Sequence, residues 1–206
     1  MKMDDIIAKL DTRLRRLNSL PDDPPGMKCY GTENEGASIF LTVTPLEKSS
    51  AMPFDNPKSV VDGIHKALAD DQGIVEVANG TVGERARYVY SIVKTAEQPS
   101  GVQYCLTMHV DANGEFAAIQ GFFSERGATG MRDTMVLEHC VRAGTIGTAD
   151  MKGWTFDPYD PGRRRGLLMN LSEKAEYDQA FPAHPLSQLR GIVRLLVEGK
   201  EQDGAC

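Results

Sequence analysis

The chain has 206 residues, of which 41% are hydrophobic and 25% are charged, and its formal net charge is −6. This length and composition indicate one globular domain with a full core and an appended segment, and they exclude an intrinsically disordered chain. The acidic balance argues against a nucleic-acid partner, because such binding needs a clustered basic surface and the one basic run, at 163–165, is short.

Residues 4–20 carry apolar side chains at helical spacing with charges between them. This pattern predicts an amphipathic helix of about four turns that ends before Pro21, followed by a linker rich in helix breakers up to Gly26. So short a helix is marginal alone, so it must dock on its own domain or in a partner's groove. The apolar positions are Ile6, Ile7, Leu10, Leu14 and Leu17.

The next hundred residues are typical of a sheet with one helix inserted. Residues 27–30 and 38–46 are β-type runs that predict a hairpin. Asn56 suits an N-cap and Pro57 the first helical position, which predicts a helix over 57–71. Four further strands are predicted, and the short turns between the last three favour antiparallel neighbours. These strands are 74–78, 85–95, 102–111 and 115–123.

Alternation along these strands places apolar side chains on both faces, so both faces need cover. The helices available are 4–20, 57–71 and 129–143. The last has Thr129 as its cap and an inner stripe of Met131, Met135, Val136 and Cys140. We therefore predict an α+β fold: a core domain at 27–143 with a largely antiparallel sheet covered by helices on both faces, an α/β/α sandwich.

Residues 144–206 have a different character and predict a helical C-terminal extension packed on the core. A segment rich in glycine and threonine begins at Gly144 and predicts a hinge, and a segment rich in aromatics, prolines and aspartates follows from Trp154 to Gly162. A short helix is expected near 172–179. A longer one is expected over 185–198, where Leu186, Leu189, Val193 and Leu196 form one face.

The order of elements over 27–143 resembles the PsbP-like and DcrB-like fold group. The residues that carry the resemblance are Phe54–Ser59 at the opening of a helix, Arg87–Ile92 and Tyr104–His109 in strands, and Phe116–Phe123. The resemblance implies a protein that is mostly non-catalytic and binds or stabilises other proteins, as a small chaperone or adaptor does. It supplies no catalytic motif to carry over, and fold alone does not fix function.

The sequence contains no assembled catalytic set. Cys105 and His109 share a strand face but lie about 13 Å apart at strand rise, too far for a nucleophile and its base. The Asp-Pro segment at 157–161 lacks the regular ligand spacing of a calcium loop and is more typical of turns. We therefore expect no metal and no cofactor. Because the cysteines Cys29, Cys105, Cys140 and Cys206 are widely spaced, they indicate free thiols and a cytoplasmic protein.

The extension supplies the candidate binding residues, because tryptophan, tyrosine and arginine dominate binding hot spots. Its aromatics also suit a second interpretation, as anchors that pin the extension to the core. The histidine could pair with Glu176 as acid and base, or cap the helix that follows it. The arginine could bind a phosphate or carboxylate, or lie in a solvated turn. These candidates are Trp154, Tyr159, Arg164 and His184.

Together these patterns predict a non-catalytic, adaptor-like or chaperone-like protein that binds a protein partner or a copy of itself, with no nucleic acid and no membrane span. One alternative is a small-molecule-binding protein or enzyme whose site lies between the sheet and the extension. The other is a purely structural subunit. The candidate residues for the small-molecule site are His109, Asp160, Arg164 and His184.

Overall fold

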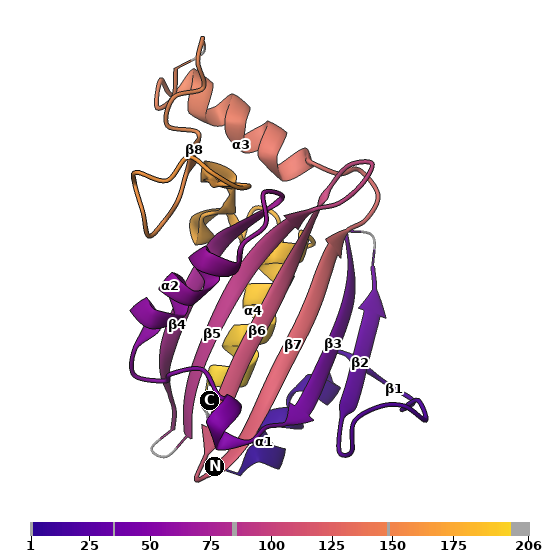
Figure 1. Ribbon diagram of the computed structural model, residues 1–206. Helices are drawn as coiled ribbons and strands as arrows, with labels where there is room; N and C mark the ends of the chain where they lie inside the picture. Colours follow the sequence, from indigo (N-terminus) through magenta and orange to yellow (C-terminus); the bar gives the residue numbers. More distant parts are fainter. Residues whose placement is uncertain (1, 35, 84–85, 148, 199–206) are drawn as a thin grey trace, which may run out of the picture.

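The structure, a computed structural model, describes residues 2–34, 36–83, 86–147 and 149–198 (Figure 1). A seven-stranded antiparallel sheet with the order β1-β2-β3-β7-β6-β5-β4 forms its centre. The predicted mixed fold with a large antiparallel sheet is therefore confirmed. The strands are β1 (Arg15–Leu17), β2 (Lys28–Glu33), β3 (Ala37–Pro45), β4 (Gln72–Val82), β5 (Ala86–Ala96), β6 (Val102–Ala112) and β7 (Glu115–Glu125).

Four α-helices accompany the sheet in the described part of the chain: α1 (Met3–Ile7), α2 (Pro57–Ala67), α3 (Met131–Arg142) and α4 (Pro185–Val197). The predicted start of α2 is confirmed, since the Asn56 side chain accepts from the Ser59 backbone N–H and Pro57 takes the first turn. The helix predicted over 185–198 is confirmed as α4. Within the described residues, no helix has the length and apolar character needed to cross a bilayer.

The hairpin turns fix the antiparallel order. Between β6 and β7, Asn113 and Gly114 both have positive φ, the backbone that a two-residue turn between twisted strands requires. The predicted hairpin of β2 and β3 is confirmed, with Tyr30 opposite Leu41. β3 also pairs with β7 along its full length. This pairing joins the part of the sheet formed by β1 to β3 to the part formed by β4 to β7.

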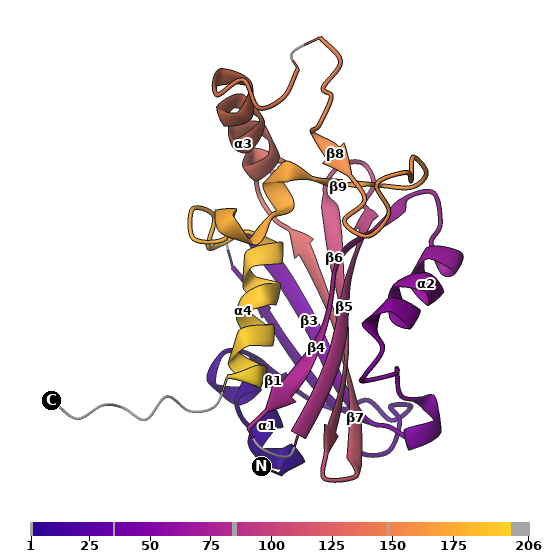
Figure 2. The same cartoon turned by 90° about the vertical axis from the view of Figure 1, so that its left-hand side faces the viewer.

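One face of the sheet is covered by α4 together with α1 (Figure 2). The apolar side of α4 packs into the same cluster as Ile39, Leu106 and Ile119 of the sheet, all of them buried. Because this burial is a large favourable contribution, α4 is part of the main core rather than an addition to a finished domain. The buried side chains of α4 include Leu186, Leu189, Ile192, Val193 and Leu196.

The opposite face is covered only in part. α2 lies over the β4 and β5 side, where Val60 and Val61 pack with Ile74, Val77 and Val89. Over β3 and β7 no described helix covers this face, and Phe40 and Phe122 are 42% and 41% exposed. The complete two-sided cover expected from the alternation is therefore not what the described residues form.

The four-turn helix expected over 4–20 is wrong. The chain forms α1, a 3-10 turn η1 (Leu10–Thr12), and then the edge strand β1, whose Leu17 pairs with Cys29. The N–H and C=O groups of Arg15–Leu17 find hydrogen-bond partners in β2. In a helix continuing past Leu14, the same groups would depend on partners within the helix itself. The apolar stripe itself docks on the protein's own core, because Ile6, Ile7, Leu10 and Leu14 are all buried.

α3 also differs from expectation. It lies beyond the end of the strands in both views, where it packs against the 3-10 turn η3 (Leu171–Glu173), and it covers no face of the sheet. Its N-cap is Gly130 in the left-handed region rather than Thr129. Met131 and Met135, expected inside, are each 54% exposed. Arg132 is buried instead with Val136 and Cys140, because its guanidinium enters an ionic cluster.

The extension between α3 and α4 is tied to the edge of the sheet. The Leu167 N–H donates to the Gln72 carbonyl at 2.9 Å. At Gly73 an added Cβ would lie 1.7 Å from the Leu167 carbonyl oxygen, so the approach requires glycine. The short helix expected near 172–179 forms only two 3-10 turns, η3 and η4 (Ala175–Tyr177), and a small ladder joins β8 (Thr155–Phe156) to β9 (Met169–Asn170).

Candidate functional site

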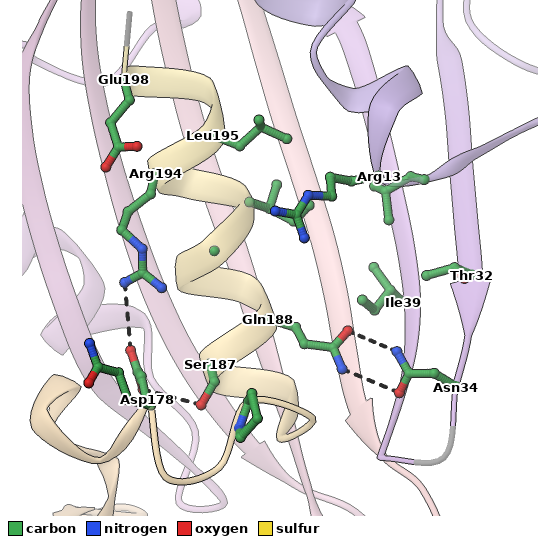
Figure 3. Close-up of a pocket in the computed structure, with 15 residues that line it drawn as sticks. Arg13, Thr32, Asn34, Ile39, Asp178, Ser187, Gln188, Arg194, Leu195 and Glu198 are labelled. Atoms are coloured by element: carbon green, nitrogen blue, oxygen red, sulfur yellow. Dashed lines mark hydrogen bonds and ion pairs between the residues drawn. The ribbon is translucent and has the colours of Figure 1, made fainter. Parts of the chain in front are cut away.

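The outer side of α4 forms the floor of a pocket of about 650 Å³, which we call the α4 pocket (Figure 3). One wall comes from residues before β1 and from β2 and β3, and the other comes from the segment 178–182. The pocket therefore lies between the sheet and the C-terminal extension. Its polar lining residues include Arg13, Thr32, Asn34, Asp178, Ser187, Gln188, Arg194 and Glu198.

The helical repeat of α4 explains this floor. Ser187, Gly191, Arg194 and Glu198 recur at intervals of three or four residues and so share one side of the helix. Gly191 lies at the middle of this side, and an added Cβ there would meet no atom within 4 Å. The glycine is therefore not required by packing, and its lack of a side chain leaves the middle of the pocket open.

The wall formed by the sheet is ordered by a pair of amides. Asn34 Nδ2 donates to Gln188 Oε1 at 3.0 Å, and Gln188 Nε2 donates back to Asn34 Oδ1 at 3.3 Å (Figure 3). Asn34 Oδ1 also accepts the Ala37 N–H, which holds this side chain in the turn between β2 and β3. Above it, the Arg13 guanidinium extends toward α4 (Figure 3). This wall thus presents fixed amides and one cation.

The other wall covers a buried ionic cluster centred on Asp178, which is 6% exposed. Asp178 Oδ1 receives hydrogen bonds from Arg132 at 3.2 Å, from Arg190 at 3.1 Å and from Ser187 at 3.3 Å. Asp178 Oδ2 has no hydrogen-bond donor among the described residues, and Arg194 Nη1 lies 3.8 Å from it. We call these five residues the Asp178 cluster.

Further ion pairs continue the cluster into the sheet. Glu173 accepts from Lys94 Nζ at 2.7 Å and from the Tyr104 hydroxyl at 2.9 Å, with all three side chains buried. Arg190 also pairs with Glu76 at 2.8 Å. Every one of these charges has an opposite charge in contact, as buried charges require. The arrangement joins β4, β5 and β6 to the extension and fixes the position of α4.

The pKa shifts in the cluster follow from burial and from these partners. Burial and then the Glu173 carboxylate raise the pKa of Tyr104 well above its usual value. Burial lowers the pKa of Arg132, while Asp178 opposes that shift. For Arg190 the Glu76 and Asp178 carboxylates outweigh desolvation, and its pKa is raised. The raised pKa values favour a protonated Tyr104 and a charged Arg190, and a guanidinium such as that of Arg132 is not deprotonated in proteins, which suits a fixed electrostatic wall better than proton transfer.

None of the predicted site residues lines the α4 pocket. Trp154 packs with Val136 and Cys140 beside α3. The Tyr159 hydroxyl accepts the Val77 N–H at 2.6 Å and donates to the Val77 carbonyl at 3.1 Å, so it anchors the extension on the edge of β4. This matches the interpretation of the aromatics as anchors.

The remaining candidates also have local partners. Arg164 donates to the carbonyls of its own loop and is exposed. Asp160 accepts from the Gly162 N–H. His184 Nδ1 accepts the Leu186 N–H at the start of α4, which confirms its interpretation as a helix cap, and its Nε2 lies 3.4 Å from Glu125. Glu176, its expected acid-base partner, is exposed and forms no hydrogen bond or ion pair with it.

The structure also places His109, both as a candidate site residue and as a neighbour of Cys105. His109 Nδ1 accepts the Met52 N–H at 2.8 Å, and burial lowers its pKa. Cys105 lies on the same strand face four residues away and pairs across to Phe122, so the two residues form no dyad. Among the described residues, no group of three or more His, Cys, Asp and Glu side chains is arranged to hold a metal ion.

Sequence reasoning missed Arg13, Arg132, Asp178 and Arg194. For Arg132 a signal was available: Arg132, Val136 and Cys140 recur every four residues, which places a charge in line with an apolar stripe. For the others no local signal exists, since the pocket depends on how far α4 lies from β2 and β3. That distance is a tertiary property.

A second surface also has functional interest. The uncovered part of the sheet, which we call the aromatic face, has Phe40 directly opposite Phe122 in the ladder. The residues directly next to this pair on the same side are uncharged: Gly31, Ser38 and Thr42 next to Phe40, and Cys105, Gln120 and Ser124 next to Phe122. Two charged residues also lie on this side, at the edge formed by β1 and β2, where Arg15 is opposite Gly31 and Glu33 is opposite Ser38.

Comparisons with known proteins do not identify the chain. No protein-family model matches it, and no curated protein matches it. Among solved structures it is similar to the crystal structure of PA94, a Pseudomonas aeruginosa protein of unknown function, with a TM-score of 0.36 and 5% sequence identity over 63% of this chain and 94% of that chain. A similarity of this size carries no argument about function. The resemblance to the PsbP-like and DcrB-like group therefore stays a prediction.

Proposed function

We propose that this is a non-catalytic binding protein whose partner is another protein, and that the aromatic face is the contact surface. The observation that supports this proposal is the exposed pair Phe40 and Phe122, 42% and 41% exposed on adjacent strands. Two large, neighbouring apolar side chains that are exposed to solvent favour binding of another surface over them, because burying their apolar area is favourable.

The chemistry of the aromatic face restricts the partner. The residues directly around Phe40 and Phe122 carry no formal charge, so an apolar, uncharged surface can cover this centre without burying an unpaired charge, while Arg15 and Glu33 lie toward the edge formed by β1 and β2. A second copy of this chain meets that requirement, because a two-fold contact places the same uncharged patch on both sides. Such a copy would also supply the missing second layer of the expected sandwich. We therefore take self-association as the first form of the proposal to test.

Sedimentation of the wild-type chain and of a Phe40→Ser/Phe122→Ser variant tests it. We expect a wild-type dimer that the variant converts to a monomer. A Met131→Ser/Met135→Ser variant on α3 is the control, since it removes a similarly exposed apolar pair elsewhere. If the wild type is a monomer, a photo-crosslinking amino acid at position 122 should capture a different protein from its own cells, and position 135 should not. Equal products at both positions would contradict the proposal.

We also propose a cytoplasmic location as part of this function. The three described cysteines, Cys29, Cys105 and Cys140, are free, as expected for thiols in a reducing compartment. Fractionation of the native cells, followed by thiol labelling before and after reduction, tests this location. Disulfide-linked protein in an oxidising fraction would contradict it.

A second candidate function, small-molecule binding between the sheet and the extension, is supported by the α4 pocket. Its volume of about 650 Å³ is in the range of ligand sites, and both the sheet and the extension line it. Mass spectrometry of molecules released from denatured native protein tests this function. We expect a released compound that a Gly191→Leu variant, in which the new side chain fills the middle of the pocket, does not retain.

A further inference from the structure

We propose that the α4 pocket binds a small organic anion, one that carries a carboxylate or phosphate group together with a neutral hydrogen-bond donor such as a hydroxyl or an amide N–H. This inference rests on the second proposed function and goes beyond it by naming the chemical class of the ligand. Its basis is the charge of the pocket walls together with one buried acceptor that lacks a donor.

The charges of the Asp178 cluster leave one guanidinium without a close partner. Arg132 is paired with Asp178, and Arg190 is shared between Asp178 and Glu76. Among the described residues, Arg194 has only the 3.8 Å ion pair with Asp178 and donates no side-chain hydrogen bond, and its side chain is half exposed toward the pocket. Three cations therefore face two carboxylates here. The surplus charge attracts an anion.

A second cation faces Arg194 across the pocket. The Arg13 guanidinium extends over α4 from the opposite wall, and it has no ion pair or hydrogen bond with any residue of the described ranges (Figure 3). The pocket also contains Glu198, but the nearby Lys9 ammonium offsets its charge, since the two interact and Lys9 Nζ donates to the Glu198 carbonyl. Carboxylate and phosphate groups match the fork of donors that arginine presents.

The buried acceptor specifies the rest of the ligand. Asp178 Oδ2 has no hydrogen-bond donor in the described structure, although Asp178 is more than nine-tenths buried and lines the pocket. A buried carboxylate oxygen without a donor is costly, so a donor from the ligand would be favourable. An ammonium group is disfavoured here by the guanidinium groups of Arg132, Arg190 and Arg194. A neutral hydroxyl or amide N–H is therefore the fitting donor.

Ligand entry requires only side-chain motion. Arg194 lies above Asp178 on the same side of α4 with its guanidinium directed at Asp178 (Figure 3), and a rotation of this half-exposed side chain toward the bound anion would free Asp178 Oδ2 for the ligand's donor. Gly191 leaves the floor between the two arginines clear. The anion would thus lie over Gly191, with its donor directed at Asp178.

Isothermal titration calorimetry at low salt with four probes tests the ligand class. Malate carries carboxylates and a hydroxyl, succinate lacks the hydroxyl, glycerol 3-phosphate carries phosphate and hydroxyls, and glycerol has no charge. We expect malate or glycerol 3-phosphate to bind, with the tighter of the two showing whether carboxylate or phosphate is preferred. Succinate should bind about 10-fold more weakly than malate, and glycerol should show no binding.

Three pocket variants and one control locate the binding. Arg13→Gln and Arg194→Gln should each weaken the best probe about 10-fold, and Gly191→Leu should abolish its binding. Arg142→Gln is the control, because it removes the same charge from the exposed side of α3, where the ion pair of Arg142 within the described part of the chain is with Glu138. Equal binding to all four variants, or no binding of any anion to the wild type, would overturn the inference.

The compound released from native protein separates this inference from the function on which it rests. A released cation or an uncharged molecule that Gly191→Leu fails to retain would support small-molecule binding and overturn the anion proposal. Release of no compound, with malate or glycerol 3-phosphate bound at the Arg13 side of the pocket, would support the anion site alone.

Discussion

The two faces of the sheet contrast with one another. On one face α4 and α1 bury an apolar core, and the Asp178 cluster closes the end where α4 begins. On the other face α2 covers the β4 side, while Phe40 and Phe122 stay exposed. The same alternation of apolar residues thus produces a finished core on one side and an open surface on the other. Alternation determines which residues share a face, but the connections decide which face a helix covers.

The largest expected loss of stability comes from a substitution in the Asp178 cluster, on the face that α4 covers. Arg132→Ala removes a guanidinium that bonds Asp178, Ser187 and the carbonyls of Ser172 and Lys174. It leaves Asp178 with less compensation in a buried site, and we expect a loss of about 3–5 kcal/mol in the free energy of unfolding. Urea denaturation measures it. Arg142→Ala, exposed on the same helix, should change stability by less than about 0.5 kcal/mol.

A second prediction compares the stability lost when an apolar side chain is removed from the covered face and from the aromatic face. Leu189→Ala creates a cavity between α4 and the sheet and should cost about 2–5 kcal/mol. Phe40→Ser on the aromatic face removes a larger side chain, yet in the monomer it should cost far less, since that ring is already partly in water. Urea denaturation of the two variants at low protein concentration compares them. Similar losses would mean that the second face is covered after all.

A third prediction concerns the attachment of the extension to β4. Gly73→Ala would place a methyl group against the Leu167 carbonyl, and we expect a loss of about 1–3 kcal/mol. Hydrogen exchange should show faster exchange at the Leu167 amide, which bonds Gln72. Gly191→Ala is the matched control: it meets no atom and should stabilise α4 by about 1 kcal/mol. A stable Gly73→Ala protein with a protected Leu167 amide would refute the close approach.

The smallest effect is a pH dependence under α2. Burial lowers the folded-state pKa of His109 below its usual 6.5, and its neutral ring accepts the Met52 N–H. Protonation therefore favours the unfolded chain, so His109 contributes stability above pH 6.5 that is lost as the pH falls through the lowered pKa. Between about pH 7 and about pH 5 the wild type should lose more stability than His109→Gln. Parallel losses in urea titrations at both pH values would contradict this.

The sequence predicted the local elements correctly where the pattern of residues fitted one kind of secondary structure. The strands from 72 to 125, the Asn56 cap with Pro57, and the α4 stripe all follow from alternation, capping or helical spacing. It failed where a tertiary contact outweighed that pattern. Arg15–Leu17 pairs with β2 instead of continuing a helix, and Met131 and Met135 turn outward because Arg132 is drawn into the Asp178 cluster.

What the sequence determined by itself is therefore the strands β2 to β7, the antiparallel pairing of strands joined by short connections, and the identity of most core side chains, because those depend on contacts between near neighbours. The α4 pocket, the Asp178 cluster and the aromatic face were decided only by the tertiary structure. Each of them brings together residues far apart in the chain, as Asn34 and Gln188 show. No short-range pattern encodes such a distance, because it depends on how the packed elements share one core.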